Sequence, residues 1–229
     1  MTAKKDEKPP HLFKFKDNFH ELFNDWTFYY LIPNRLNSKT PNWNSYLKKL
    51  HDFGTFEDFW AIINSIEPAG QLQKGCRYYI FKKDIRPLWE DEKNTGGREI
   101  SIQYNLPPEP KGKHFHNNQP TPHYAEYLKK LEPIQTMAQE KWIELSVAIL
   151  CNKSNYFVHN EFINGIEFNV RAKAIKVGIW TKPVTEEQFE QIKNDLIKIL
   201  KFGDHPDQEE FWTEVIMLEK EKEAMRQKK

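Results

Sequence analysis

Two apolar segments joined by a short turn constrain the fold of this chain more than any other feature of its sequence. Residues 163–170 and 176–180 are rich in isoleucine, valine and other apolar residues, and only the turn around 172–175 separates them. Two strands with so short a connection pair antiparallel, because a parallel pair needs a crossover of roughly a dozen residues or more. The sequence therefore predicts an antiparallel sheet.

Residue periodicity predicts the other elements. Alternating or densely aromatic segments are typical of strands, and apolar residues spaced three and four apart are typical of helices. The expected strands span 25–32, 76–81 and 99–104, and the expected helices span 55–66, 138–151 and 185–200, with a further helix from 121 and a charged helical pattern from 207 to the end. Strands and helices in mixed order with antiparallel connections predict an α+β domain.

The ends and faces of the helices carry signals of their own. Thr55 with Asp58 and Thr185 with Gln188 have the spacing of a capping box or a variant of it. The helix over 138–151 has two apolar stripes, namely Trp142, Leu145 and Ile149, and then Ile143, Val147 and Leu150. A surface helix needs only one stripe for the core, so the second is predicted to face a partner.

Charged and turn-forming residues indicate the domain boundaries. Residues 1–19 mix charges with scattered aromatics and are expected to form a flexible extension before a single domain over 20–229. Residues 105–122 are rich in proline, glycine, asparagine and histidine and are also expected to be flexible. A polar loop is a better interpretation than a metal site for the three histidines in and beside this segment, His114, His116 and His123.

Composition argues against several classes of protein. The two cysteines have no metal-ligand spacing, and a disulfide framework is not expected, which predicts a reducing compartment, the cytoplasm or also the nucleus. No apolar stretch approaches the roughly 18 residues of a membrane span, and the N-terminus lacks the apolar core of a secretory signal. A net charge of only +1 argues against coating of a long nucleic acid, so any nucleic-acid site is small and local.

Two polar loops, at 33–44 and 82–98, each hold a tryptophan, Trp43 and Trp89. Trp89 is followed directly by three acids, Glu90, Asp91 and Glu92. On spacing alone, an acidic turn with Trp89 packed beneath it is as good an interpretation as a binding site. The functional interpretation requires a ligand that presents both an aromatic face and hydrogen-bond donors to a carboxylate.

Guanine methylated at N7 is such a ligand. The methylated ring is positively charged, so a cation–π attraction adds to its stacking on an indole, and stacking of one base on one aromatic contributes roughly 1–3 kcal/mol. The N1–H and N2–H groups of guanine are parallel donors that a single carboxylate accepts. We therefore expect Trp43 and Trp89 to enclose the base and Glu90 to bind its edge.

The triphosphate of an mRNA cap also needs basic side chains near this slot. Arg171 and Lys176 follow Asn169 on a strand and its turn, and Arg98 follows a pair of glycines. Arg171 and Lys176, taken alone, are more simply interpreted as part of a solvated strand face. Their combination with the two tryptophan loops favours a phosphate site.

Three segments closely resemble the eukaryotic translation initiation factor 4E family, which binds the mRNA cap. They are TFEDFWAI at 55–62, IRPLWEDEKNTGGR at 85–98 and NVRAKAIKVGIWT at 169–181. The resemblance runs from about residue 20 to about residue 200. It implies a curved antiparallel sheet with helices packed on the convex face and the cap slot on the concave face. It also makes 105–137 a long insertion and 204–229 a divergent, charged C-terminal segment.

The resemblance implies a role for individual residues in cap binding. Trp43 and Trp89 resemble the stacking pair, Glu90 resembles the base-reading carboxylate, and Trp180 resembles a tryptophan close to the methyl group. Trp26 resembles a structural tryptophan. The implied phosphate ligands are Arg171 and Lys176, supported by Asn169 and Arg98. One departure lies beside them, since Glu99 replaces a usual tryptophan. The resemblance implies no catalytic residue, cofactor or metal.

The family also binds partner proteins on its convex face, through a helix with the motif Tyr-x-x-x-x-Leu-φ, where φ is apolar. Such helices belong to the scaffold initiation factor 4G and to inhibitory binding proteins. The residues at the matching places are His20, Trp60, Ile143, Glu144 and Val147. The simpler interpretation of Trp60 is a core residue of its helix. We expect a monomer.

Several functions remain open on sequence alone. The leading one is a translation initiation factor, not an enzyme, that binds capped mRNA and recruits a scaffold. A cap-binding repressor of translation or a specialised isoform is the nearest alternative. An enzyme acting on capped RNA is less favoured, because consecutive loop acids do not converge on one metal ion and no nucleophile with its base is evident. An interaction module without cap binding is disfavoured by the presence of Trp43, Trp89 and Glu90.

Overall fold

The computed structural model describes residues 19–33, 46–151 and 157–200, together with the backbone of 211–216. Nearly all of the expected N-terminal extension, the loop that carries Trp43 and most of the C-terminal segment lie outside these residues. The predictions about the flexible extension and about Trp43 therefore concern residues outside the described part of the chain.

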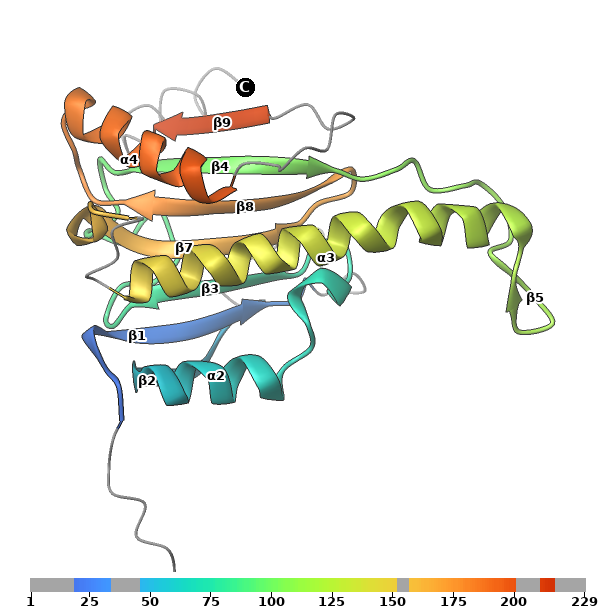
Figure 1. The fold of residues 1–229 in the computed structure, drawn as a ribbon, viewed down its shortest axis with the longest axis horizontal. Helices are drawn as coiled ribbons and strands as arrows, with labels where there is room; N and C mark the ends of the chain where they lie inside the picture. Colours follow the sequence, from blue (N-terminus) through green and yellow to red (C-terminus); the bar gives the residue numbers. More distant parts are fainter. Residues whose placement is uncertain (1–18, 34–45, 152–156, 201–210, 217–229) are drawn as a thin grey trace, which may run out of the picture.

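A curved antiparallel sheet of seven strands, in the order β2-β1-β3-β7-β8-β4-β9, forms the centre of the molecule (Figure 1). The strands are β1 (Glu21–Leu31), β2 (Leu47–Thr55), β3 (Arg77–Lys82), β4 (Arg98–Asn105), β7 (Ile163–Val170), β8 (Ala174–Thr181) and β9 (Phe211–Ile216). The predicted pairing of β7 with β8 is confirmed, with Val170 opposite Ile175 beside the turn. The α+β class is confirmed as well.

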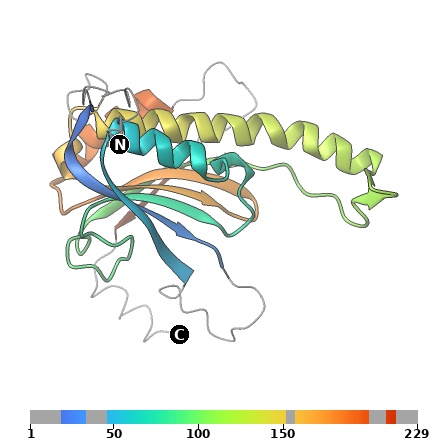
Figure 2. The same cartoon turned by 90° about the horizontal axis from the view of Figure 1, so that it is seen from below.

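Three α-helices lie on one face of the sheet, which is its convex face (Figure 2). They are α2 (Phe56–Ser65), α3 (Pro122–Leu150) and α4 (Glu186–Leu200), and two short 3-10 helices, η1 (Ala69–Gln71) and η2 (Asn160–Phe162), connect elements. Both predicted caps form: the Thr55 hydroxyl accepts from Asp58 N at 3.1 Å, and Thr185 and Gln188 bond reciprocally.

Side chains alternate between the two faces of the sheet, as the strand period of two requires. The face beneath the helices holds the main core, which includes Trp26, Phe28, Ile80, Ile102, Phe168 and Ile179. The opposite, concave face carries a smaller aromatic cluster made of Tyr29, Leu31, Leu47, Tyr79, Phe81, Ile85 and Trp180. The structural role implied for Trp26 agrees with its complete burial.

Two expectations about secondary structure are wrong, and one strand was not predicted. The expected helices from 121 and over 138–151 form one helix, α3, which passes through Pro133. The charged pattern after 207 contains strand β9, which pairs with β4. Without β9, β4 would expose a row of unpaired backbone groups at the sheet edge, and pairing here overrides the local helical pattern. Strand β2 was not expected, because its sequence LKKLHDFGT is mostly polar.

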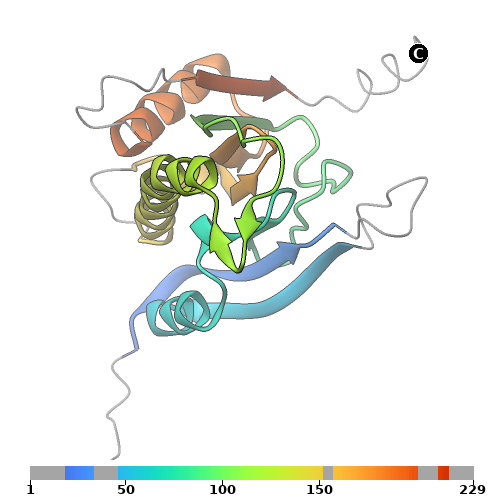
Figure 3. The ribbon, with the colours of Figure 1, turned by 90° about the vertical axis from the view of Figure 1, so that its right-hand side faces the viewer.

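The segment expected to be flexible at 105–122 contains a small hairpin, β5 (Phe115–His116) with β6 (Gln119–Pro120). Its two-residue turn has positive φ at Asn117 and Asn118, as a type I′ turn requires. The hairpin and the first half of α3 project beyond the end of the sheet, and Figure 3 views them end on. We call residues 106–137 the hairpin arm.

Further properties of the described part of the chain bear on function. None of its helices combines the length and apolarity that crossing a membrane demands. Its histidine, cysteine and acidic side chains do not gather in threes at any potential metal site. Both cysteines are free, Cys76 buried and Cys151 exposed.

Candidate functional site

The loop between β3 and β4 is held in shape by two of its polar side chains. The Asn94 amide donates to the carbonyl oxygens of Arg86 and Leu88, each at 2.9 Å. The Asp91 carboxylate accepts from the backbone N–H groups of Arg86 and Lys93. Asn94 is fully buried, so the middle of the loop has a core of its own. These bonds fix the backbone that carries Trp89.

The loop closes tightly on the end of β8 through a pair of glycines. A Cβ added at Gly97 would lie 1.9 Å from the carbonyl oxygen of Thr181, far inside any real contact. The preceding Gly96 has a φ of +74°, which favours glycine. The two glycines therefore let the loop close on the backbone of Thr181, which follows Trp180 on β8.

Trp89 and Trp180 stack on each other on the concave side. Their ring centroids lie 3.6 Å apart at an interplanar angle of 15°. Trp89 is half-buried at the edge of the aromatic cluster, while Glu90 and Glu92 next to it are exposed. Of the three loop acids, Asp91 serves the loop itself, and Glu90 is the acid next to the indole that is open to a ligand.

A buried carboxylate fixes the second indole. Glu167 on β7 accepts from Trp180 Nε1 at 3.1 Å and from the Asn169 amide at 2.9 Å. Two cations, Arg77 and Lys176, each lie 3.6 Å from the same carboxylate. Glu167 thus couples the orientation of Trp180 to the charged residues of the concave face.

Lys176 lies in a buried ion pair with Glu99. Lys176 and Glu99 are 3% and 5% exposed, and the ammonium contacts the Glu99 carboxylate. Burial, together with the neighbouring Arg77 guanidinium, lowers the pKa of Lys176 to about 7, because desolvation and a like charge both disfavour the ammonium. The lysine implied as a phosphate ligand therefore already has an anionic partner inside the protein.

The other predicted phosphate residues lie in different surroundings. Arg171 is exposed in the β7–β8 turn, and Asn169 is the cross-strand neighbour of Lys176. Arg98, in contrast, lies on the helix side of the sheet, where it pairs with Glu186 of α4 and its guanidinium sits 4.2 Å over the Phe189 ring. The structure brings Trp89, Trp180, Asn169 and Lys176 to one face and leaves Arg98 on the other.

A groove of about 320 Å³ runs between α2 and α3 on the helix side. Trp60, which is 40% exposed, lines it together with Ile143. Val147 packs half-buried beside the core. Leu150, expected in the same stripe, is buried, which corrects the predicted extent of that stripe. Glu144 is exposed on α3 and accepts a hydrogen bond from Lys141.

His20 adjoins the start of α2. Its backbone N–H donates to Glu57, its ring nitrogen Nδ1 lies 2.7 Å from the same carboxylate, and its carbonyl accepts from Phe56 N. These contacts hold the chain before β1 against the first turn of α2. His20 therefore lies beside the first turn of α2, the helix that also carries Trp60.

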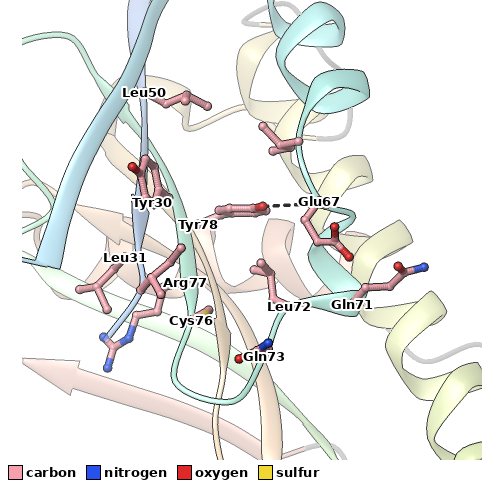
Figure 4. Close-up of a pocket in the computed structure, with 12 residues that line it drawn as sticks. Tyr30, Leu31, Leu50, Glu67, Gln71, Leu72, Gln73, Cys76, Arg77 and Tyr78 are labelled. Atoms are coloured by element: carbon pink, nitrogen blue, oxygen red, sulfur yellow. Dashed lines mark hydrogen bonds between the residues drawn. The ribbon is translucent and has the colours of Figure 1, made fainter. Parts of the chain in front are cut away.

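A larger hollow of about 600 Å³ lies between β1, β3 and η1 (Figure 4). Tyr78 crosses it and donates to the carbonyl oxygen of Glu67 at 3.0 Å. Ile66 and Glu67 line both this hollow and the groove at Trp60. Arg77 also lines it and pairs with Glu167. The hollow thus lies between the groove at Trp60 and the charged residues Arg77 and Glu167 of the concave face.

Sequence reasoning missed Arg77 and Glu167 as members of the site. A usable signal exists for Glu167, because it is the single charged residue in the otherwise uncharged strand INGIEFNV, and a buried charge is rarely unpaired. It shares a face with Asn169 by the period of two. Arg77 carries no such signal, because its partners come from other strands.

Comparisons with known proteins agree on one family. The family model described as Eukaryotic initiation factor 4E matches residues 21–229. Initiation factor 4E of Candida albicans is 32% identical over 196 residues, which are 84% of this chain and 80% of that protein. Initiation factor 4E1 of Drosophila melanogaster is 29% identical, and the match covers 84% of this chain but only 60% of that protein.

Two solved structures are similar in fold and sequence. Initiation factor 4E-3 of Caenorhabditis elegans, in complex with the 4E-binding protein Mextli and a cap analog, has a TM-score of 0.63 at 28% identity and covers 90% of this chain and 96% of that one. Initiation factor 4E-3 of Ascaris suum with the m7G cap has a TM-score of 0.62 at 28% identity and covers 81% and 87%. The family match extends past residue 200, beyond the three motif segments.

Proposed function

The chain belongs to the eukaryotic initiation factor 4E family, and from this premise we propose that it binds the 7-methylguanosine cap of mRNA and acts in translation initiation. One observation carries the proposal. The Trp89 and Trp180 indoles stack at 3.6 Å on the concave face, with the exposed Glu90 carboxylate adjoining them. This arrangement offers flat apolar faces and an acid to a charged, planar base.

The base is held by residues from two loops. Trp89 leaves its stack with Trp180 and encloses the methylated ring together with Trp43, so that cation–π attraction adds to stacking. Glu90 accepts from N1–H and N2–H of the guanine, and the Trp89 backbone N–H donates to O6. Trp180, oriented by Glu167, then faces the N7-methyl group.

The triphosphate lies along β8 toward the β7–β8 turn. Lys176 binds it in the middle of the concave face, and Arg171 binds it at the turn. Asn169 supports this region by its bond to Glu167. Arg98 binds no phosphate in this proposal, since its contacts with Glu186 and Phe189 hold it on the helix side.

The groove between α2 and α3 binds an amphipathic helix with the Tyr-x-x-x-x-Leu-φ motif. Its apolar lining includes the exposed Trp60 indole and Ile143, which suits recognition of a helix by its apolar anchors. The scaffold initiation factor 4G is the proposed partner, and inhibitory binding proteins compete for the same groove. The alternatives are a family member that binds the cap but represses translation and one that is specialised for unusual caps. Binding of the scaffold motif discriminates between these and an initiation factor. We place the protein, as a monomer, in the cytoplasm or the nucleus.

An enzyme that acts on capped RNA is disfavoured by the loop chemistry. Asp91 is engaged by two backbone N–H groups, so it is not available to form a metal site with Glu90 and Glu92. Members of the matched family are initiation factors. Recovery of intact 7-methyl-GTP after incubation with the protein tests this directly.

Titration with 7-methyl-GTP and with GTP, followed by tryptophan fluorescence, tests the proposed function. The methylated nucleotide should quench the indoles and bind much more tightly, because only its ring is cationic. Trp89→Ala removes a stack worth roughly 1–3 kcal/mol, and Glu90→Gln removes the charge assistance. Glu92→Gln is the matched control, an exposed acid two residues away that should not change affinity. Equal affinity for the two nucleotides would defeat the proposal.

A further inference from the structure

The hairpin arm lies where RNA would leave the proposed cap slot. Trp180 and Lys176 lie four residues apart on β8, about 13 Å at 3.3 Å per residue, and point to the same face. The chain direction of β8 places Trp180 at one end and the turn with Arg171 and Lys173 at the other. Along β8, the proposed cap slot at Trp180 is therefore followed by Lys176 and then by the β7–β8 turn.

The arm begins at that same turn. The backbone N–H of Leu106 donates to the Lys173 carbonyl at 2.8 Å, and an ion pair between Lys74 and Glu109 ties the start of the arm to the body. Figure 1 shows the hairpin and the first half of α3 extending past this end of the sheet. An RNA that follows β8 outward therefore meets the arm after the β7–β8 turn.

The hairpin has a built aromatic surface. The His114 ring stacks on Tyr124 of α3 with centroids 4.3 Å apart and an interplanar angle of 2°, and Tyr124 stacks in turn on Tyr127. Phe115 packs edge-on against Tyr124 yet is 56% exposed. The ring stack supports the hairpin from one side and leaves one large aromatic face open to solvent.

The charges on the hairpin favour an anionic ligand. Lys111, Lys113 and His116 are all exposed, and neither lysine forms an ion pair with any residue that the structure describes. The hairpin segment 106–121 has a single acid, Glu109, which is engaged by Lys74. On the helical half of the arm, by contrast, Glu126 is paired with Lys130. Exposed lysines flanking an exposed aromatic suit single-stranded nucleic acid, because its phosphates bind the lysines and its bases stack on the ring.

We propose that the hairpin of this arm binds the single-stranded RNA that follows the cap, with Lys111 and Lys113 on phosphates and Phe115 stacking on a base. The inference rests on the proposed cap-binding function and extends the site from the cap to the first nucleotides of the message. Stacking and phosphate binding are tolerant of sequence, so the hairpin raises affinity for capped RNA in general. If Phe115 instead binds a protein partner, this chain should bind the cap alone and capped RNA with the same affinity.

The test compares the dinucleotide m7GpppG with a capped oligonucleotide of about ten uridines, by competition binding to the full chain. Wild-type protein should bind the capped oligonucleotide at least about five-fold more tightly, as one added stack implies. Phe115→Ala, and separately Lys111→Gln with Lys113→Gln, should remove most of this advantage and leave m7GpppG affinity unchanged. The salt dependence should also weaken in the lysine variant, by a slope of about 0.7 for each phosphate that the variant no longer neutralises.

Lys193→Gln with Lys198→Gln removes the same charge from α4, on the convex face, and is the matched control. It should keep the full advantage of the capped oligonucleotide. If m7GpppG binds but the oligonucleotide gains nothing, or if the hairpin variants keep the gain, the inference about the arm is overturned and cap binding stands. If m7GpppG itself fails to bind, the proposed function fails first.

Discussion

Glu99 is predicted to oppose the binding of the cap triphosphate, so Glu99→Gln should bind it more tightly. The carboxylate contacts the Lys176 ammonium, and both groups are buried on the concave face. A phosphate that reaches Lys176 must share the ammonium with Glu99. In Glu99→Gln the amide keeps the shape and the polar contact but removes the competing negative charge.

The size of the effect follows from the geometry. A phosphate on the far side of the ammonium lies roughly 6–8 Å from the carboxylate, where repulsion at an effective dielectric constant of 20 is about 2–3 kcal/mol. Loss of Glu99 also makes the buried ammonium harder to keep charged, which offsets part of this gain. A net gain of about 1–2 kcal/mol remains, which corresponds to affinity for m7GpppG roughly 5- to 30-fold tighter.

The assay is titration calorimetry of m7GpppG and of 7-methylguanosine at pH 6, below the pKa of about 7 of Lys176. The nucleoside has no phosphate, so its affinity should be unchanged. Glu187→Gln, an exposed acid on α4, is the matched control for charge. The variant should also lose stability, by less than the 3–5 kcal/mol typical of a broken buried pair, because Glu167 remains 3.6 Å from Lys176. Unchanged or weaker binding of m7GpppG would refute competition by Glu99.

Three further predictions concern the pH dependence of Lys176, the groove at Trp60 and the contacts of Arg98. Because the pKa of Lys176 is lowered to about 7 and a bound phosphate favours the ammonium, binding of the cap triphosphate takes up a proton. The ratio of m7GpppG affinity to 7-methylguanosine affinity should therefore fall about ten-fold or more from pH 6 to pH 8.5. A ratio that does not change with pH contradicts this prediction. Trp60→Ala should weaken a Tyr-x-x-x-x-Leu-φ peptide by at least about 2 kcal/mol in an anisotropy assay without changing cap affinity; equal peptide affinity places the partner elsewhere. Arg98→Ala should lower the free energy of unfolding in urea by about 1–2 kcal/mol, because the guanidinium no longer packs on Phe189, and leave cap affinity intact; the reverse pattern would return Arg98 to the phosphate site.

Local sequence signals predicted those elements whose evidence lies within a few residues. The caps at Thr55 and Thr185 and the β7–β8 hairpin all follow from short spacings, and the structure has them. Strands β2 and β9 were not predicted, because their sequences carry no clear alternation. Both lie at the edges of the sheet, where a strand is selected by the neighbour it pairs with. The sequence of an edge strand alone does not show which strand it pairs with.

For the candidate site, too, local sequence signals predicted some residues, while those that depend on pairing between strands were missed. The WEDEKN segment indicated Trp89 and Glu90 because an indole beside acids in a polar loop is chemically unusual. The Glu99–Lys176 pair and the role of Glu167 depend on cross-strand register, which places Lys176 beside Asn169 and Glu99 opposite Trp180. Spacing along one strand does not give this register.

Arg98 was misplaced for a different reason, since its side of the sheet could have been predicted. In the strand REISIQYN, Arg98 shares a face with Ile100 and Ile102, which are core residues. A period of two therefore turns Arg98 toward the helices, away from Glu99 and the concave face. Its proximity to the glycine pair suggested a phosphate role, and the alternation argues against that role.

The central claim is that the cationic base takes the place of Trp180 as the stacking partner of Trp89. A crystal structure of the complex with 7-methyl-GTP measures this directly. We predict that Trp89 moves from its position 3.6 Å from Trp180 and lies parallel to the guanine, with Trp43 on the opposite face and Trp180 against the methyl group. A complex in which Trp89 stays stacked on Trp180 while the nucleotide binds elsewhere would contradict the claim.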